Sequence, residues 1–404
     1  MKWEKVKLGD IATCIQPGPF GSQLHNSDYS KEGTPIIMPK DIVGGAIVHS
    51  GLLKVSEEHV KRLSRHQVYE GNLMVARKGD VRKCAYITAN ENGWMTGSDC
   101  LKVVLDESKC YPKFIYYQLR SEHIGRWLEK VSIGATMPSL NTGLLSGIEM
   151  VLPPIEIQKQ IAGILSAYDD LIENNQRQIK LLEEAAQRLY KEWFVDLRFP
   201  GHENTEIVDG VPEGWSVYPF SSKVDIMSGG TPKTSIPDYY NGKIPFYTPK
   251  DSDGAFFAYK TQINITEGGL KNCNSRLYPP KTVIITARGT VGKTTILAVP
   301  MAMNQSCYAL KMKENDAPYY LFFALNNEIK ALQTMANGGV FNTIIGKTFD
   351  SINIQIPKDP LIYGFEKTVR PFMEQIKNKL QANSKLVEAR DRLLPKLMSG
   401  EVKV

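Results

Sequence analysis

The sequence lacks the patterns that mark membrane, secreted and zinc-binding proteins. No apolar run in its 404 residues approaches the roughly 18 residues that cross a bilayer. The opening MKWEKVKLGD carries charge but no following apolar core, so we expect no signal peptide. The six cysteines form no CxxC pair, which disfavours a zinc site and indicates reduced thiols in a cytosolic protein.

The sequence also lacks the motifs of enzymes that act on DNA. A methyltransferase for exocyclic amines needs an Asn/Asp-Pro-Pro-aromatic step, but the two Pro-Pro steps follow Leu152 and Tyr278. A metal-dependent nuclease needs clustered carboxylates, and Pro237-Asp238 has no Glu-x-Lys or Asp-x-Lys soon after it. All histidines lie at or before His202, so no histidine site could occur in both halves of the chain. These absences leave an enzyme complete in one chain as an alternative only.

Positive charge is present and is unevenly distributed. The whole chain has a net charge of +6. Residues 1–153 hold 19 Lys and Arg against 16 Asp and Glu, and residues 214–357 hold 14 against 9. Residues 195–213 hold 1 against 5. Two basic globular stretches joined by an acidic segment indicate a polyanionic partner.

The second half of the chain repeats the first. GTPIIMPKDI (33–42) aligns with GKIPFYTPKDSD (242–253), which places Lys40 on Lys250. NLMVARKGDVRKCAYI (72–87) aligns with TVIITARGTVGKTTIL (282–297), and GATMPSLNTGLLSGIEMVLP (134–153) aligns with GGVFNTIIGKTFDSINIQIP (338–357). One architecture of about 200 residues is therefore used twice.

The repeat bears on TARGTVGKTT (286–295), which matches a loose phosphate-binding loop. The first copy has VARKGDVRKC at the same place and lacks Gly-Lys-Thr. In both copies an apolar, β-branched run precedes and follows the loop, which predicts a strand, a glycine turn and a strand. We therefore interpret the segment as the tip of a basic hairpin.

Each copy ends in a long segment with heptad spacing. After Pro153-Pro154 and again after residue 358, apolar residues recur at 4-3 intervals over about 40 residues, which predicts helices of roughly 60 Å that pair as a coiled coil. Asn175 and Asn383 interrupt the seam and could set its register. Packing of each helix on its own domain is the alternative. The predicted pairing residues are Ile157, Ile161, Ile164, Leu171, Asn175, Leu182 and Leu189, with Phe365, Phe372, Ile376, Asn383, Leu386 and Leu393.

Taken together, these segments resemble the specificity subunit of type I restriction–modification systems. The resemblance covers nearly the whole chain and rests on the duplicate layout, W..VKLGDIA (3–12), GTPII with the following Lys-Asp, PSLNTGLLSGIEMVLPP (138–154) and LYKEWFVDLRFP (189–200). The second copy departs from it, because INIQIPKDPLIYGF lacks the double proline, and that departure concerns only where its helix starts.

The resemblance implies a mixed α/β fold with two target-recognition domains in tandem, joined by two long helices that form an antiparallel coiled coil. The corresponding segments are residues 1–153, a central helix at 154–198, a linker at 199–213, residues 214–357 and a C-terminal helix at 358–404. It implies a prokaryotic cytoplasmic protein in which each domain reads half of a split double-stranded DNA target in the major groove, with the helices setting the spacer.

The resemblance further implies that this chain is not an enzyme and binds no cofactor itself. Its partners would be two methyltransferase subunits, which bind S-adenosylmethionine, and restriction nuclease subunits, which use ATP and Mg. An adaptor that binds only protein is a further alternative, but it would leave two basic domains unexplained.

The candidate DNA-contacting residues lie in loops that occur in both copies. Arginine and lysine supply contacts to phosphates and base edges, and glycine-rich loops allow close approach to the backbone. For any one residue, a solvated surface role remains open. The candidates are Ser22, Gln23, Lys40, Arg77, Lys78, Arg82 and Lys83 in the first copy, and Thr231, Lys233, Lys250, Arg288 and Lys293 in the second.

Overall fold

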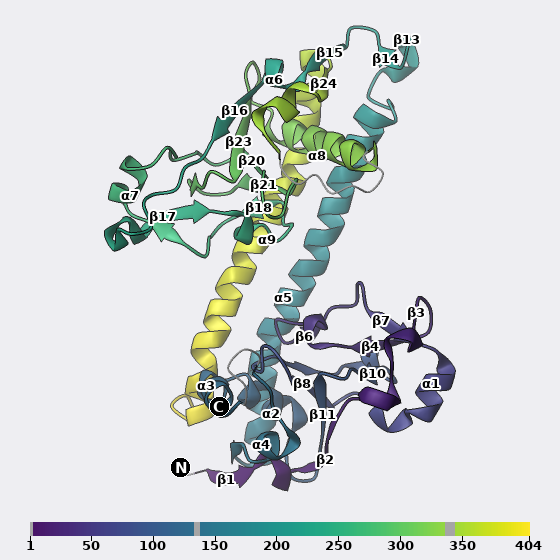
Figure 1. Ribbon diagram of the computed structural model, residues 1–404, viewed down its shortest axis with the longest axis vertical. Coiled ribbons are helices and arrows are strands. Elements are labelled where there is room, and N and C mark those ends of the chain that lie inside the picture. The colour runs from purple at the N-terminus through teal and green to yellow at the C-terminus, as the bar shows by residue number, and fades with distance from the viewer. Residues whose placement is uncertain (1–2, 133–137, 336–343) are drawn as a thin grey trace. The chain divides into compact units, whose positions relative to one another are not determined.

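The structure is a computed structural model that describes residues 3–132, 138–335 and 344–404. It divides into two compact units (Figure 1). The first unit comprises residues 1–172 and 385–404, and the second comprises residues 173–384. Each unit therefore contains one copy of the repeat together with a part of each long helix.

The elements of the first unit begin at the amino terminus. They are β1 (Glu4–Lys7), β2 (Ala12–Pro17), β3 (Tyr29–Ser30), β4 (Thr34–Ile37), β5 (Ile42–Val43), β6 (Ala46–Ile47), β7 (Leu53–Val55), α1 (Glu57–Arg62), β8 (Leu73–Ala76), β9 (Cys84–Tyr86), β10 (Met95–Thr96), β11 (Cys100–Leu105), α2 (Pro112–Leu119), α3 (Glu122–Val131), α4 (Thr142–Ser146) and β12 (Glu149–Leu152). The long helix α5 (Ile155–Tyr190) follows and runs on into the second unit.

The second unit continues along the chain. Its elements are β13 (Ile207–Val208), β14 (Val211–Pro212), β15 (Ser216–Pro219), α6 (Phe220–Lys223), β16 (Val224–Ser228), β17 (Tyr240–Tyr247), β18 (Phe257–Ala258), β19 (Asn264–Ile265), α7 (Glu267–Lys271), β20 (Val283–Thr286), β21 (Thr294–Leu297), β22 (Ala302–Met303), β23 (Cys307–Met312), α8 (Pro318–Met335) and β24 (Asn353–Ile356). The last helix, α9 (Asp359–Ser399), returns to the first unit.

The central sheet of the first unit is buried on both faces. Its strand order is β2-β11-β8-β9, and all its pairs are antiparallel. Because side chains alternate along a strand, Leu73 and Val75 of β8 pack with Phe114 of α2 on one face. Met74 points to the other face and packs with Ile37 of β4. The sheet thus lies between the helices and a second sheet of order β10-β4-β7-β3.

The second unit repeats this topology. Strands β16-β23-β20-β21 have the order of β2-β11-β8-β9, with β18 added at the edge. The antiparallel pair β15-β24 matches β1-β12, and the parallel pair β17-β22 matches β4-β10. The duplicated mixed α/β architecture predicted from the sequence is therefore confirmed.

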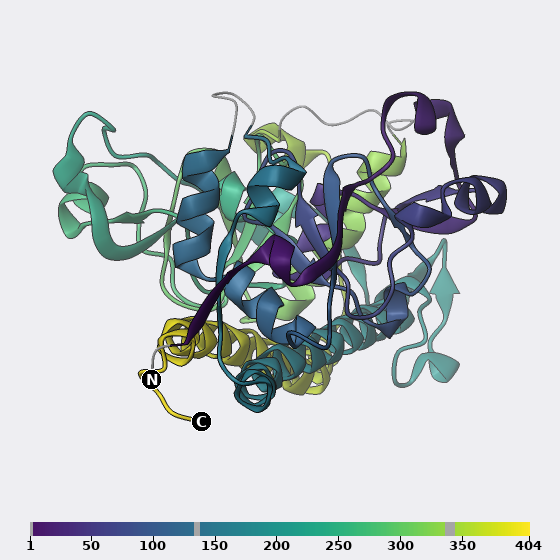
Figure 2. The same cartoon turned by 90° about the horizontal axis from the view of Figure 1, so that it is seen from below.

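Segments of α5 and α9 lie side by side and antiparallel within each unit (Figures 1 and 2). In the first unit Ile161 and Leu165 of α5 share a core with Leu394 of α9. In the second unit the rings of Tyr190 and Phe365 are 5.9 Å apart. Residues near the start of α5 therefore pack with residues near the end of α9, and residues near the end of α5 pack with residues near the start of α9. The chain leaves α9 at Gly400, whose φ of 73° suits a helix stop.

The buried face of α5 corrects two predicted pairing residues. Ile164 is 38% exposed and Leu171 is 52% exposed, whereas the following residues, Leu165 and Ile172, are buried and half-buried. In the first unit α5 packs on its own domain as well as on α9, so its inward face is turned by one residue from the ideal seam. In the first unit α5 thus packs both on α9 and on its own domain, whereas the alternative raised by the sequence was packing on the domain in place of pairing.

The other predicted pairing residues lie inward or at the edge of the seam. Asn175 Nδ2 donates a hydrogen bond of 2.8 Å to Oδ1 of Asn383. The side chains of Ile161, Phe365 and Ile376 are buried. Those that are partly buried are Ile157, Leu182, Leu189, Phe372, Leu386 and Leu393.

The predicted linker at 199–213 is more structured than a simple turn. It contains the β13-β14 hairpin, and the helical path continues past α5 through one π-helical turn, Lys191–Val195. Phe199 is buried, with its ring 5.1 Å from that of Trp215. The start of the linker is therefore part of the core of the second unit.

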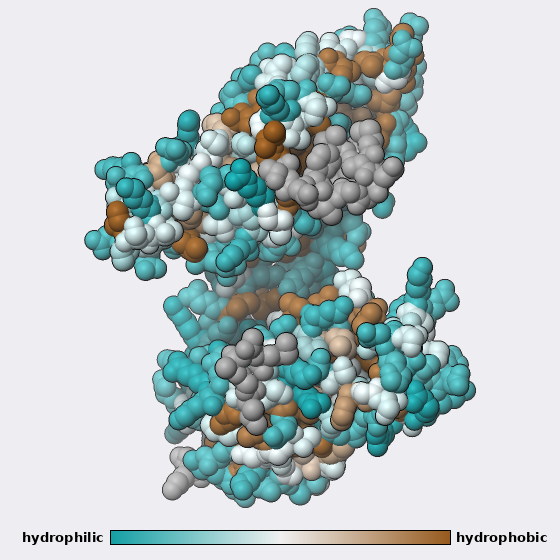
Figure 3. Space-filling view, viewed as in Figure 1, coloured by the Kyte–Doolittle hydropathy of each residue, from teal (hydrophilic) through white to brown (hydrophobic). Residues whose placement is uncertain are grey.

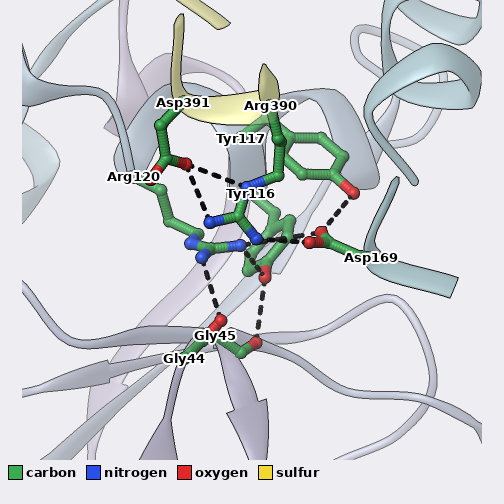
Figure 4. Close-up of polar contacts among 8 residues, drawn as sticks. All are labelled: Gly44, Gly45, Tyr116, Tyr117, Arg120, Asp169, Arg390 and Asp391. Atoms are coloured by element: carbon green, nitrogen blue, oxygen red, sulfur yellow. Dashed lines mark hydrogen bonds and ion pairs between the residues drawn. The ribbon is translucent and has the colours of Figure 1, made fainter. Parts of the chain in front are cut away.

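A buried polar network joins α9, α5 and α2 in the first unit (Figure 4). Arg390 of α9 donates to the carboxylate of Asp169 on α5, and the Tyr117 hydroxyl donates to the same carboxylate at 2.7 Å. The Arg120 guanidinium donates to the Tyr116 hydroxyl at 2.6 Å. Through these contacts one arginine fixes where the end of α9 meets the domain.

The network also holds the turn between β5 and β6. Arg120 donates to the carbonyl oxygen of Gly44 at 2.9 Å, and Tyr116 donates to that of Gly45 at 3.0 Å. Gly45 has a φ of 95°, and a Cβ there would lie 2.3 Å from the Tyr116 hydroxyl, so this position favours glycine.

We expect Arg390→Met to loosen the end of α9. The substitution keeps the apolar stem but removes the charged donor from Asp169, which should cost about 2 kcal/mol. Hydrogen exchange of peptides from residues 385–399 should show the loss of protection. Arg392→Met is the matched control, because the Arg392 side chain is largely exposed and pairs only with Glu388 within the described residues. Equal protection in both variants would contradict a role for the network.

Candidate nucleic-acid interface

Four loops gather at one edge of the central sheet in each unit. We define loop cluster 1 as residues 18–23, 38–41, 77–83 and 97–99, and loop cluster 2 as residues 229–233, 248–251, 287–293 and 304–306. Lys83 Nζ donates to the carbonyl oxygen of Pro39 at 3.0 Å, and Thr290 Oγ1 donates to that of Pro249 at 3.2 Å. Each hairpin tip thus lies against the Pro-Lys-Asp turn of its own unit.

The hairpin predicted in place of a phosphate-binding loop is confirmed. Strand β20 pairs antiparallel with β21, as β8 does with β9, and no helix follows the loop. Both tips turn at a glycine with positive φ, 79° at Gly79 and 80° at Gly289. The tips therefore project the basic residues before these glycines, Lys78 and Arg288, which are both exposed.

The Pro-Lys-Asp turns are built alike in the two units. The Asp41 carboxylate accepts the backbone N–H of Met38 at 2.8 Å, and Asp251 accepts that of Thr248 at 2.8 Å. Each aspartate is used in closing a 3-10 turn, whereas the lysine before it, Lys40 or Lys250, is exposed. The turn can therefore present a cation next to the hairpin tip.

Two other predicted contact residues are directed away from the tips. The Arg82 guanidinium binds Glu122 and Glu129 of α3, and its pKa is raised chiefly by the hydrogen bond to Glu122. Lys293 lines a cleft of about 800 Å³ together with residues of α5 and α8, in the second unit. Their DNA contact stays a prediction, and the geometry favours it less than for Lys78 or Arg288.

The glycine-rich loops differ between the two clusters. In cluster 1 Phe20 is 53% exposed, and the Arg77 guanidinium carbon lies 5.4 Å from the centre of its ring. In cluster 2 the Thr231 hydroxyl donates to Oε1 of Gln305. From the sequence Phe20 could stack, wedge or pack in the core, and Gln305 is not singled out. Both glycine-rich loops were already candidates through Ser22, Gln23, Thr231 and Lys233. Gln305 lies instead between β22 and β23 and carries no local sequence signal.

The remaining candidates lie at the rims of these loops. Ser22, Thr231 and Lys233 are exposed. Gln23 is half-buried, and its carbonyl oxygen accepts a hydrogen bond of 2.9 Å from Arg62. Lys78 forms an ion pair with Asp99 at 3.2 Å, and both side chains are partly exposed. Because an exposed ion pair is weak, a phosphate could compete with Asp99 for this lysine.

Cluster 2 is the more uniformly basic of the two. It holds Lys233, Lys250, Arg288 and Lys293 against one acidic residue, Asp251. Cluster 1 holds five basic residues, Lys40, Arg77, Lys78, Arg82 and Lys83, against Asp41, Asp80 and Asp99. An excess of cations on exposed loops favours a polyanion as the partner.

Metal sites and membrane spans are the other features to consider. Across residues 3–132, 138–335 and 344–404, no group of three or more His, Cys, Asp or Glu is placed to hold a metal ion. Within the same ranges no helix is long and apolar enough to cross a membrane. On the face drawn in Figure 3 the surface is mainly hydrophilic, with apolar residues in separate patches.

Comparison with known proteins finds similarity to type I restriction specificity subunits. A model of the type I restriction modification DNA specificity domain family matches residues 1–184 and 212–383. The type I restriction enzyme MjaIX specificity subunit of Methanocaldococcus jannaschii is 26% identical over 412 residues, covering 100% of this chain and 94% of that protein. The HindI specificity subunit of Haemophilus influenzae is 22% identical over 466 residues, covering 99% of each.

A solved structure has the same fold. The S subunit of a type I restriction-modification system from M. genitalium matches with a TM-score of 0.60 at 18% identity. The match covers 98% of this chain and 96% of that one.

Proposed function

This chain belongs to the type I restriction modification DNA specificity domain family, and on that premise we propose that it is the non-catalytic subunit that reads a bipartite DNA target. One observation carries the proposal. The two units present equivalent loop clusters on equivalent sheets, but the side chains of the clusters differ. Two domains of the same fold with different loop side chains are suited to a DNA target with two unlike halves.

In this proposal each loop cluster enters the major groove of one half-site. Exposed lysines and arginines such as Lys40 and Arg288 would bind phosphates and set the position of the domain. Side chains that reach base edges would supply the sequence specificity. The paired helices would define the number of unread base pairs between the halves, as the spacing of a dimer does on a palindrome.

The helices would also dock two methyltransferase subunits and, in a full system, the nuclease subunits. Exposed apolar side chains on this helical path are the groups that a docked subunit would cover in this proposal. They include Ile164 and Leu171 in the first unit and Leu181 in the second, and Val195 is exposed in the π-helical turn that follows. S-adenosylmethionine would bind to the methyltransferase partner, and ATP and Mg to the nuclease partner.

We expect deletion of this gene to remove methylation from one split motif in the source genome. The measurement is a methylation map of cells with the gene intact, deleted and restored. A motif of two unlike halves with a fixed gap should disappear on deletion and return on restoration. An unchanged map in all three strains would contradict the proposal and favour the protein-only adaptor.

A further inference from the structure

Backbone hydrogen bonds define which positions of the two loop clusters correspond. The N–H of Arg77 donates to the carbonyl oxygen of Asp99 at 2.7 Å, and the N–H of Ala287 donates to that of Ser306 at 2.7 Å. The strands before these residues have the same register, because Ala76 faces Cys100 as Thr286 faces Cys307. Arg77 therefore corresponds to Ala287, Lys78 to Arg288 and Ser98 to Gln305.

The glycine-rich loops can be matched in the same way. Pro17 faces Leu101, and Ser228 faces Tyr308, at the same step of the sheet. A Cβ on Gly18 would lie 2.0 Å from the carbonyl oxygen of Gly97, and one on Gly229 would lie 2.2 Å from that of Asn304. Both loops thus leave the sheet where the glycine backbone lies against the backbone of the neighbouring loop. Phe20 is three residues after Pro17 and Thr231 is three residues after Ser228, so Phe20 corresponds to Thr231.

The comparison separates shared positions from unlike ones. Lys40 corresponds to Lys250, and Lys78 to Arg288, so both clusters keep a cation at these two places. Contacts to the phosphate backbone carry no sequence information and are needed by both domains. Residues that distinguish the two half-sites should instead be sought where the clusters differ in chemistry.

In cluster 1 the unlike position is an arginine held by an aromatic ring. The guanidinium of Arg77 lies over the exposed ring of Phe20. This contact limits the rotamers of Arg77 but leaves the N–H donors in the plane of the guanidinium group. A planar pair of donors matches O6 and N7 of guanine in the major groove. Ala287 offers no such group in cluster 2.

In cluster 2 the unlike position is a glutamine held by a hydroxyl. The Thr231 hydroxyl donates to Oε1 of Gln305, which is itself exposed. This contact orients the amide and leaves Oε1 a second lone pair, with the two N–H donors of Nε2 beside it. One acceptor next to one donor matches N6 and N7 of adenine. Ser98 is too short to make this pair in cluster 1.

We propose that Arg77, positioned by Phe20, reads a guanine in one half-site, and that Gln305, positioned by Thr231, reads an adenine in the other. The inference rests on the proposed function and adds to it the bases and the side chains that read them. It assigns Lys78 and Arg288 to the phosphates. The half-site of the first unit then contains a G·C pair at this position and that of the second unit an A·T pair.

The test uses the full-length chain co-expressed with its methyltransferase subunits, and short duplexes that carry the split motif found in the methylation map. Binding is measured for the motif and for duplexes with each base pair replaced in turn. Arg77→Ala and Arg77→Lys should lose about 10- to 100-fold of discrimination at one G·C pair in one half. Gln305→Ala should do so at one A·T pair in the other half.

The control variants separate reading from positioning and from folding. Lys78→Ala and Arg288→Ala should weaken binding to all duplexes alike and lower the salt dependence by about one counterion. Phe20→Ala should lose part of the discrimination that depends on Arg77, whereas Phe20→Tyr keeps a ring and should retain it. Arg77→Lys keeps the charge, so a loss in that variant cannot come from a lost cation.

Several outcomes would overturn the inference. These are a motif whose halves lack the G·C or A·T pair, unchanged discrimination in the Arg77 and Gln305 variants, or an effect of both variants on the same half. A wild-type complex that selects no split motif would instead contradict the proposed function itself. The two failures are therefore distinguishable.

Discussion

Phe365→Ala is expected to lower the free energy of unfolding of the second unit by about 3–5 kcal/mol. Phe365 of α9 is fully buried, at 0% exposure, and its ring packs between α5 and α8. Ring centres of Phe194 and Tyr190 lie 5.1 and 5.9 Å away, and that of Phe323 lies 6.2 Å away. Truncation leaves a cavity among rigid rings that cannot collapse to fill it.

The effect of this substitution on the two long helices follows from the position of the ring. It joins the carboxyl-terminal part of α5 to the start of α9, so its loss should release both helices from the second unit's core. Hydrogen exchange of peptides from α5, α8 and α9 gives the local opening free energy. Tyr363→Ala, two residues earlier on the same helix, is the control, because Tyr363 is 68% exposed and should cost less than about 0.5 kcal/mol. Similar protection in both variants would contradict this account of the core.

Glu366→Gln is expected to remove a pH dependence of stability that the wild-type chain shows between about pH 5 and 8. Glu366 is 4% exposed, and its Oε1 accepts the N–H groups of Tyr319 and Tyr320 at 2.8 Å each. Its Oε2 is buried and finds no hydrogen-bond partner within the described residues. Burial raises the pKa of this carboxyl from 4.5 to about 7, against the lowering effect of the two N–H donors.

The sign follows from that raised pKa. The folded protein binds the proton of Glu366 more tightly than the unfolded chain does. The contribution of this group to stability is therefore complete below about pH 4.5 and is lost as the pH rises through about 7. The loss is on the order of 3 kcal/mol for a shift of this size. A glutamine cannot ionise, so the variant should show a flatter profile in urea unfolding at pH 5, 6, 7 and 8.

The first unit supplies the reciprocal variant. Gln158 of α5 has a role similar to that of Glu366, because each side chain accepts backbone N–H groups at the start of a helix. Its Oε1 accepts the N–H of Tyr111, the residue before α2, at 2.8 Å. Its Nε2 donates to the carbonyl oxygen of Pro153 at 2.8 Å. Gln158→Glu should introduce the pH dependence that Glu366→Gln removes. Parallel profiles for the wild type and both variants would show that neither group is coupled to folding in this range.

Much of the architecture follows from local patterns that the sequence displays directly. The hairpin at 286–295 could be distinguished from a phosphate-binding loop because β-branched runs flank it and the first copy lacks Gly-Lys-Thr. The long helices follow from heptad spacing, which also places Asn175 and Asn383 in the seam, whereas their hydrogen bond to each other is seen only in the structure. Turn glycines, strand composition and helical periodicity act over a few residues, so their effects can be read without the fold.

The loop clusters proposed to bind DNA could be predicted only in part. Lys40, Lys78, Lys250 and Arg288 are exposed at the loop clusters where the repeat suggested cations would lie. The sequence did not indicate that Arg82 is held by two glutamates of α3. Such partners come from elsewhere in the chain and have no local signature.

By itself, the sequence determined the duplication, the class of fold, the hairpins and the long helices, because periodicity and turn chemistry are properties of neighbouring residues. Only the tertiary structure decided which flank of α5 is buried, so that Leu165 and not Ile164 lies inward. It also placed Phe20 under Arg77 and Thr231 beside Gln305. These pairings join residues 57 and 74 positions apart, and they exist only because the sheet brings their loops together.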